Sequence, residues 1–298
     1  MMRTMRSLLT PPAPGLPSHA TDRPRTDARR GWLAWSTGVA VAAVCLLLSA
    51  CGSLPAGDGP QGLADLKTQS DQTESERRAR VRLELAAAYF AEGKSAVALD
   101  EVKQAIAADP KLPEAYNLRG LIYAAMAEPR LAEDSFRQAL QLSPRDGAVM
   151  HNHAWFLCQA SRHEEAQALF QRALAEPRYT GRVRTLLAQG VCLVRAGRLE
   201  PAQRVLAQAY ELDPSNPFTG FHLGEVLFLQ GDHERAAFYL RRLHAQPETA
   251  SPRSLWLAAR NAHRLGNAVE ARMWGQRLRD RFPQAPETLL FEKGRFDG

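Results

Sequence analysis

The feature that most constrains this chain is a repeat of about 34 residues, which extends from residue 77 to near residue 286. One alanine recurs in each of six units, at spacings of 34, 34, 36, 34 and 35 residues: Ala98, Ala132, Ala166, Ala202, Ala236 and Ala271. A small residue stands twelve positions before each of them: Ala86, Gly120, Ala154, Gly190, Gly224 and Ala259. A repeat in constant phase predicts a stack of similar units in which each unit packs on its neighbours.

Each unit has the pattern of two antiparallel helices joined by a tight turn. The small residues allow the two helices to approach closely, and glycine in the turn supplies a left-handed conformation. A proline then ends the second helix. This pattern resembles the tetratricopeptide repeat, which implies an all-α superhelix of about six helix-turn-helix repeats. We expect the units near 79–112, 113–146, 147–180, 183–216, 217–250 and 252–285.

The N-terminal residues 1–50 have the pattern of an export signal. Arg29 and Arg30 precede about twenty uncharged, mostly apolar residues, and the stretch ends in Leu48-Ser49-Ala50-Cys51. An uncleaved membrane anchor is the alternative, because about twenty such residues can span a bilayer. The four-residue ending resembles the bacterial lipobox, which implies cleavage before Cys51 and acylation of its sulfur. The residue after Cys51 is Gly52 rather than an aspartate. By the same resemblance, this favours sorting to the outer membrane.

Two further segments flank the repeats. Residues 51–76 begin with the acylated cysteine and are rich in Gly, Pro, Ser and acidic residues, which predicts a flexible tether with a typical end-to-end distance of about 28 Å. The repeats occupy residues 77–286, and residues 287–298 form a C-terminal tail.

Charge and motifs exclude several classes of function. The net charge of +6 divides into +4 within residues 1–50 and +2 from 32 basic and 30 acidic residues downstream, which argues against nucleic-acid binding. The sequence contains no nucleophile elbow, P-loop or dinucleotide fingerprint. His151 and His153 stand two positions apart and point to different sides of a helix, so they cannot share a metal. We therefore expect no enzyme, metal, cofactor or small-molecule substrate.

By the tetratricopeptide resemblance, the first helices of the units line a concave groove that binds a protein partner. The positions that face this groove map onto Leu83, Phe90, Asn117, Leu121, His151, Trp155, Leu187, Val191, Arg195, Phe218, Phe221, Glu225, Phe228, Trp256, Arg260 and His263. Because apolar groups outnumber charges here, the expected ligand is a helix or extended segment with large apolar anchors. The alternative is that superhelix curvature buries several of them, such as Phe90, Trp155 and Phe221.

Cys158 and Cys192 are the two cysteines that follow Cys51. They fall in the first helices of the third and fourth units, which should be adjacent. An oxidising compartment would permit a disulfide between them. Two separate buried thiols, acting as small apolar fillers, are the alternative.

Two stretches are more specific than the alanine spacing. Residues 151–197, which contain WFLCQ and a later GVC, and residues 254–287, which run from SLW to RFP, resemble the PilF/PilW family of type IV pilus biogenesis and stability lipoproteins, or pilotins. The resemblance implies an outer-membrane lipoprotein on the periplasmic face that binds the pilus secretin and promotes its localisation and multimerisation. The alternative is a general periplasmic scaffold lipoprotein that docks cell-wall hydrolases or envelope assembly factors.

Overall fold

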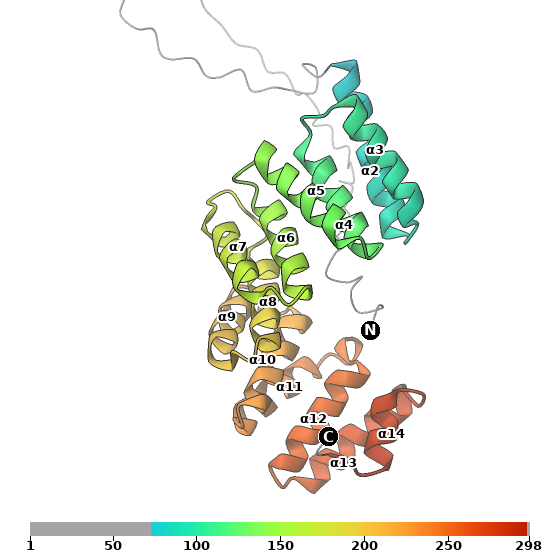
Figure 1. Cartoon of the computed structure of the whole chain (residues 1–298). Helices are drawn as coiled ribbons and strands as arrows, with labels where there is room; N and C mark the ends of the chain where they lie inside the picture. The colour runs from blue at the N-terminus through green and yellow to red at the C-terminus, as the bar shows by residue number, and fades with distance from the viewer. Residues whose placement is uncertain (1–72, 297–298) are drawn as a thin grey trace, which may run out of the picture. The chain divides into compact units, whose positions relative to one another are not determined.

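The computed structural model describes residues 73–296, and their regular structure is entirely helical. Six helix pairs follow one another along the chain (Figure 1): α2 (Glu74–Ala91) with α3 (Ser95–Ala108), α4 (Pro113–Ala125) with α5 (Pro129–Leu142), α6 (Gly147–Gln159) with α7 (His163–Ala175), α8 (Arg182–Arg195) with α9 (Leu199–Leu212), α10 (Pro217–Leu229) with α11 (His233–Leu243), and α12 (Pro252–Arg264) with α13 (Ala268–Arg281). A short 3-10 helix, η3 (Pro247–Thr249), precedes α12. The predicted all-α superhelix of paired helices is confirmed.

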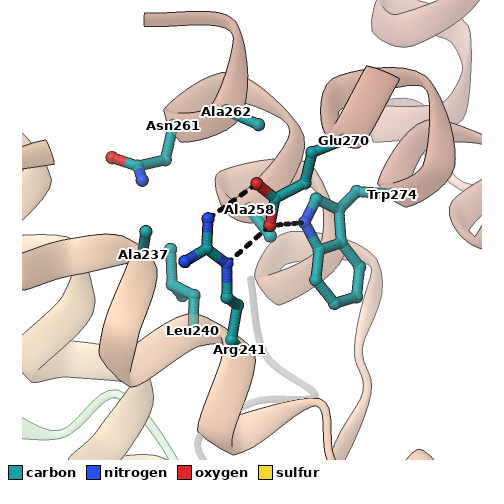
Figure 2. A pocket seen from close by; sticks show the side chains of 8 residues that line it. All are labelled: Ala237, Leu240, Arg241, Ala258, Asn261, Ala262, Glu270 and Trp274. Carbon is teal, nitrogen blue, oxygen red and sulfur yellow. Dashed lines mark hydrogen bonds and ion pairs between the residues drawn. The ribbon is translucent and has the colours of Figure 1, made fainter. Parts of the chain in front are cut away.

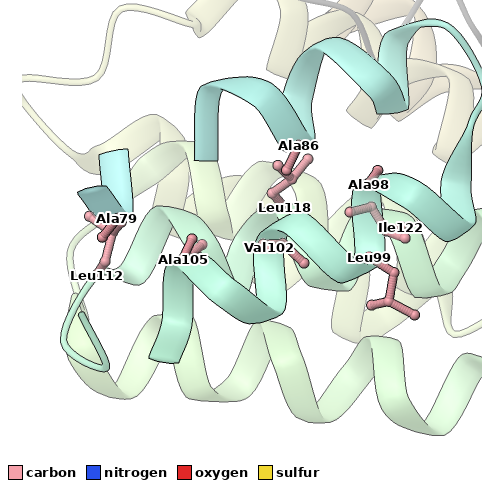
Figure 3. Packing of buried hydrophobic residues seen from close by; sticks show 10 residues of the cluster. Ala79, Ala86, Ala98, Leu99, Val102, Ala105, Leu112, Leu118 and Ile122 are labelled. Carbon is pink, nitrogen blue, oxygen red and sulfur yellow. The ribbon is translucent and has the colours of Figure 1, made fainter. Parts of the chain in front are cut away.

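The core is continuous along the stack because each pair packs on the next. The two helices of a pair contact each other, and the second helix of one pair contacts the first helix of the following pair. The first helices of successive pairs also contact one another. Figure 3 shows this packing at the first junction, where Ala98, Val102 and Ala105 of α3 lie among apolar side chains of α2 and α4.

Small residues stand where the helices of one pair approach most closely. A Cβ atom added to Gly120 would lie 2.8 Å from the Phe136 ring, and one added to Gly190 would lie 2.5 Å from Leu206. Both distances are far below van der Waals contact, so a larger residue would force the paired helices apart. The repeated small residues of the sequence thus mark the contacts within each pair.

The turns inside the pairs have a left-handed residue, as expected. Gly93, Gly197, Gly231 and Gly266 have φ between 72° and 80°. Non-glycine residues occupy this conformation in the second and third pairs, where Ala127 has φ 61° and Ser161 has φ 62°. A side chain in this region costs about 1 kcal/mol or more relative to glycine, so these two turns store strain.

The ends of the solenoid differ from the boundaries expected from the sequence. α2 begins at Glu74, inside the segment assigned to the tether, because Thr73 and Glu76 form a capping box. The predicted tail contains a helix, α14 (Pro286–Glu292), which packs on α12 and α13. The signal peptide, Cys51 and residues 52–72 lie outside the described residues. Between residues 73 and 296, no helix is both long and apolar enough to span a membrane.

Candidate functional site

The concave face, defined here as the side formed by the first helices α2, α4, α6, α8, α10 and α12, contains the residues predicted to bind a partner. Six of these residues are buried and offer little side-chain surface: His151, Trp155, Leu187, Val191, Phe228 and Trp256. Seven are half-buried: Leu83, Phe90, Asn117, Leu121, Phe221, Glu225 and Arg260. Arg195, Phe218 and His263 are exposed. The expected open apolar groove therefore does not extend to these six buried residues. Trp155 is covered by Arg195 of the next repeat, and Trp256 by Phe296 of the C-terminal segment.

Arginines cover several of the concave aromatic rings. The guanidinium of Arg195 on α8 lies 5.1 Å from the ring centre of Trp155 on α6. At the junction between the fifth and sixth repeats, Arg253 of α12 lies 5.2 Å from the ring of Phe221 on α10. A guanidinium over an aromatic face is attractive and leaves its N–H groups free to donate to a ligand. The concave face is therefore amphipathic, with apolar rings beneath positive charge.

Glu225 is the acidic group of this face, and it links two repeats. His222 donates to its carboxylate from Nδ1 at 2.9 Å, and Arg253 of the next repeat also donates to it. Burial raises the pKa of Glu225, but the hydrogen bond and charge of His222 and the charge of Arg253 outweigh that effect and keep the pKa below its usual value. Glu225 thus stays ionised and holds Arg253 over Phe221.

The junction between the third and fourth repeats contains the two cysteines. Cys158 of α6 and Cys192 of α8 are joined by a disulfide, with their Cα atoms 5.8 Å apart. His163, at the start of α7, places Nδ1 3.6 Å from the sulfur of Cys192. The three side chains would suit a metal if both cysteines were thiolates. With the sulfurs bonded to each other, His163 is the remaining ligand, and one histidine does not make a metal site.

The same junction is held by buried polar contacts. His151 and Tyr179 both hydrogen-bond to the hydroxyl of Thr185, at 2.9 Å and 2.7 Å. Burial, assisted by the charge of Arg184, lowers the pKa of His151 to about 3. Burial also lowers the pKa of His153 to about 4. Both imidazoles are neutral near pH 7. His151 contributes a hydrogen bond to this junction, whereas His153 packs on Phe136 of the second repeat.

A small pocket lies at the junction of the fifth and sixth repeats (Figure 2). It is lined by Ala237, Leu240, Arg241, Ala258, Asn261, Ala262, Glu270 and Trp274. Arg241 donates from two nitrogens to the two carboxylate oxygens of Glu270, each at 2.8 Å, and Trp274 donates to the same carboxylate at 3.2 Å. The pocket has a volume of about 10 Å³ and holds no more than one water. Its polar contacts therefore connect the two repeats rather than bind a ligand.

A larger cleft of about 460 Å³ opens over α7, α8 and α9. Its walls include Gln167 and Gln189, whose amides are joined by a hydrogen bond of 3.0 Å, together with Arg198 and Arg204. The cleft is therefore predominantly polar, in contrast to the aromatic concave face.

The concave face of the last repeat is covered by the chain itself. Phe296 lies beyond α14, and its ring stacks on His263 with the centroids 4.3 Å apart. The ring also packs against Trp256 at 5.3 Å, and Arg260 donates to the backbone carbonyl of Phe296 at 2.9 Å. Three residues predicted to face a partner thus contact the C-terminal segment instead.

Comparisons with known proteins agree with this architecture. Models of the tetratricopeptide repeat match residues 113–146, 152–217 and 187–250. The chain therefore contains tetratricopeptide repeats over residues 113–146 and 152–250. It is also homologous to the type IV pilus assembly protein PilF of Pseudomonas aeruginosa, with 25% identity over 76% of this chain and 88% of that protein.

Two solved structures show the same tetratricopeptide arrangement. The crystal structure of PilW, a widely conserved type IV pilus biogenesis factor, is 28% identical, with a TM-score of 0.67 over 72% of this chain and 98% of PilW. The structure of Pseudomonas aeruginosa PilF is 22% identical, with a TM-score of 0.66 over 74% of this chain and all of that one. Both likenesses extend over nearly the whole length of the known protein.

Sequence reasoning missed three residues around the tetratricopeptide groove. Phe296 lies in the segment assigned to a tail, but an aromatic residue near a chain end after an amphipathic helix is a signal for docking. Arg253 lies outside the groove positions, and its place over Phe221 depends on the rotation between repeats. His163 lies 29 residues before Cys192, a spacing that becomes informative only once helices from successive repeats are superimposed.

Proposed function

We propose that this chain is an outer-membrane lipoprotein that binds the type IV pilus secretin through its concave face and promotes the localisation and multimerisation of that subunit. The observation that carries this proposal is the likeness to PilF across 88% of that protein, in a chain whose sequence ends its apolar leader at a lipobox-like cysteine. The role is noncatalytic, because the concave face offers rings and arginines suited to holding a segment of another protein.

The accessible part of the concave face sets the chemistry of the bound segment. Phe218 is 48% exposed, and Phe221 is half-buried beside it on α10. Arg195 adds positive charge on the flanking helix α8, whereas Arg253 on α12 is paired with Glu225. A segment with one or two large apolar side chains and an acidic group satisfies both features. We therefore place secretin capture at the middle and later repeats.

The lipid would confine this surface to the membrane. Acylation of Cys51 adds about 0.8 kcal/mol of membrane affinity per buried methylene, so several chains give a stable anchor. Residues 52–72 would then act as a tether with a reach on the order of 25 Å. Confinement raises the effective concentration of captured secretin at the membrane without any additional contact.

A capture experiment tests the role of the concave face. In a strain that lacks the chain, we expect the double variant Phe218→Ala and Phe221→Ala to restore less than about a tenth of the heat-stable secretin multimers restored by the unchanged chain. Phe238→Ala is the matched control, because Phe238 is 56% exposed on a second helix of the same repeat. We expect this control to restore multimers and twitching motility fully.

A separate variant tests the anchor. We expect Cys51→Ala to leave the repeats folded but to send secretin to the wrong membrane. Circular dichroism checks the fold, and membrane fractionation locates the secretin. Normal secretin rings in the deletion strain, together with altered cell-wall turnover, would replace this proposal with the general scaffold.

A further inference from the structure

The C-terminal segment returns onto the concave face because α14 ends in a helix stop. Gly294 has φ 62°, and its N–H donates to the carbonyl of Phe291 at 2.9 Å. The next residue, Arg295, donates to the carbonyl of Leu290 at 3.0 Å. This left-handed glycine reverses the chain direction after α14 and brings Phe296 back to α12.

Phe296 makes the contacts of a bound peptide. Trp256, Arg260 and His263 stand at positions i, i+4 and i+7 of α12, and so share one helix face. The aromatic ring of Phe296 lies against Trp256 and His263, while its backbone carbonyl accepts from Arg260. One side chain and one main-chain group are thus recognised, as in the capture of an extended peptide.

Phe296 contacts α14 through Phe291, whose ring centre lies 6.2 Å away, but α14 has further attachments of its own. Phe291 packs where Gly275 of α13 lacks a side chain, since a Cβ atom there would lie 2.0 Å from the Phe291 ring. Thr288 is buried and donates to the carbonyl of Phe282 at 2.7 Å. These contacts hold α14 on α13 independently of the backbone that follows Gly294.

We propose that the face formed by Trp256, Arg260 and His263 is a binding pocket for an aromatic residue of an extended partner segment, and that Phe296 occupies it as a replaceable internal ligand. The proposal rests on the proposed function, because it names the segment chemistry that the C-terminal end of the concave face accepts.

The internal ligand sets a threshold for partners. A segment tethered by a few residues has an effective concentration on the order of millimolar, so a partner must outcompete it. The observed affinity for a partner then falls by the fraction of molecules in which the pocket is open. Removal of the Phe296 ring should therefore increase peptide affinity without adding any contact.

The test uses the full chain and its own C-terminal sequence supplied in trans. The probe is a fluorescein-labelled peptide of residues 293–298, and a second probe replaces its phenylalanine by alanine. We expect the Phe296→Ala protein to bind the first probe at least about tenfold more tightly than the unchanged chain does, by fluorescence anisotropy. Leu289→Ala, at an exposed position of α14, is the matched control and should bind as weakly as the unchanged chain.

Further variants locate the binding to this pocket. In the Phe296→Ala background, Arg260→Ala and His263→Ala should each weaken binding of the first probe several-fold, and the alanine probe should not bind. Equal affinity of the unchanged and Phe296→Ala proteins would overturn the proposal. So would failure of the variant to bind the first probe. The peptide assay does not measure secretin capture. If the protein binds the peptide as expected but does not capture secretin in cells, the proposed function is rejected and the pocket is not.

Discussion

The first junction of the solenoid and the junction between the third and fourth repeats solve the same packing problem with different side chains. Between α2, α3 and α4 the filling is apolar, with residues such as Leu99, Val102 and Ile122 (Figure 3). Between α6, α7 and α8 the buried groups include His151, Thr185 and a disulfide. Apolar filling tolerates small changes of register, whereas hydrogen bonds and a covalent link specify one arrangement.

This contrast shows where the geometry of the concave face is fixed most firmly. Trp155 and Arg195, which face each other across the third and fourth repeats, stand on the two helices that the disulfide joins. The polar junction therefore sets the distance between one aromatic ring and its arginine. The apolar junction supplies stability to repeats whose predicted contact residues, Leu83 and Phe90, are only half-buried.

Reduction of the disulfide should have the largest effect. The bond closes a loop of 34 residues, so its loss should lower the free energy of unfolding by about 4 kcal/mol in the chain-entropy description. Urea unfolding of the full chain with and without a thiol reductant measures this change. The double variant Cys158→Ala and Cys192→Ala is the control and should not respond to the reductant. An unchanged urea midpoint in the native chain would mean that the polar junction does not depend on the bond.

Acidification should have the next largest effect, because it acts on two buried histidines of α6, one at the polar junction and one against the second repeat. The folded pKa values of His151 and His153, about 3 and about 4, lie below the unfolded value, so the unfolded chain takes up more protons as the pH falls. The stability contribution is complete above about pH 6.5 and is lost toward pH 4. At pH 5 the loss relative to pH 7 should be about 2 kcal/mol for each histidine.

Urea unfolding between pH 7 and pH 5 checks this expectation, and His153→Phe removes one of the two groups. Phe136 stacks on His153 with the ring centres 5.3 Å apart, so phenylalanine keeps the aromatic packing. The variant should lose about 2 kcal/mol of the difference between pH 7 and pH 5, and the rest should come from His151 and from His244, whose pKa burial also lowers. A slope that does not change would assign the pH dependence to other groups.

Two isosteric or near-isosteric substitutions, one at the polar junction and one at the apolar junction, should have the smallest effects. Thr185→Val preserves shape but leaves His151 and Tyr179 without their shared hydroxyl, which should cost about 2 kcal/mol. Ile122→Val in the apolar junction removes one methylene and should cost about 1 kcal/mol. Differential scanning calorimetry compares the two. Equal or reversed losses would show that polar specificity adds nothing to stability at the fourth repeat.

Much of the fold was predictable because its constraints are local and periodic. The spacing of small residues located the close contacts inside each pair, and the turn glycines located the left-handed positions. The start of α2 lies three residues before the predicted boundary. The sequence contains a signal for it, since Thr73 and Glu76 have the spacing of a capping box.

The candidate site was less predictable because it depends on how consecutive repeats are rotated. Position within a repeat placed Trp155 and Trp256 on the concave side, but their burial depends on Arg195 from the next repeat in one case and on Phe296 in the other. Neither neighbour follows from a pattern inside one repeat. The contact between Arg260 and Phe296 spans 36 residues, close to one repeat period, but Phe296 lies beyond the last predicted unit.

The disulfide also has a mechanical consequence. A solenoid under load changes its curvature by small rotations at every joint, and the link between α6 and α8 removes that freedom at one of them. Bending must then occur at the other joints. Under tension, the repeats before and after this junction change their relative orientation, while the third and fourth repeats move as one unit.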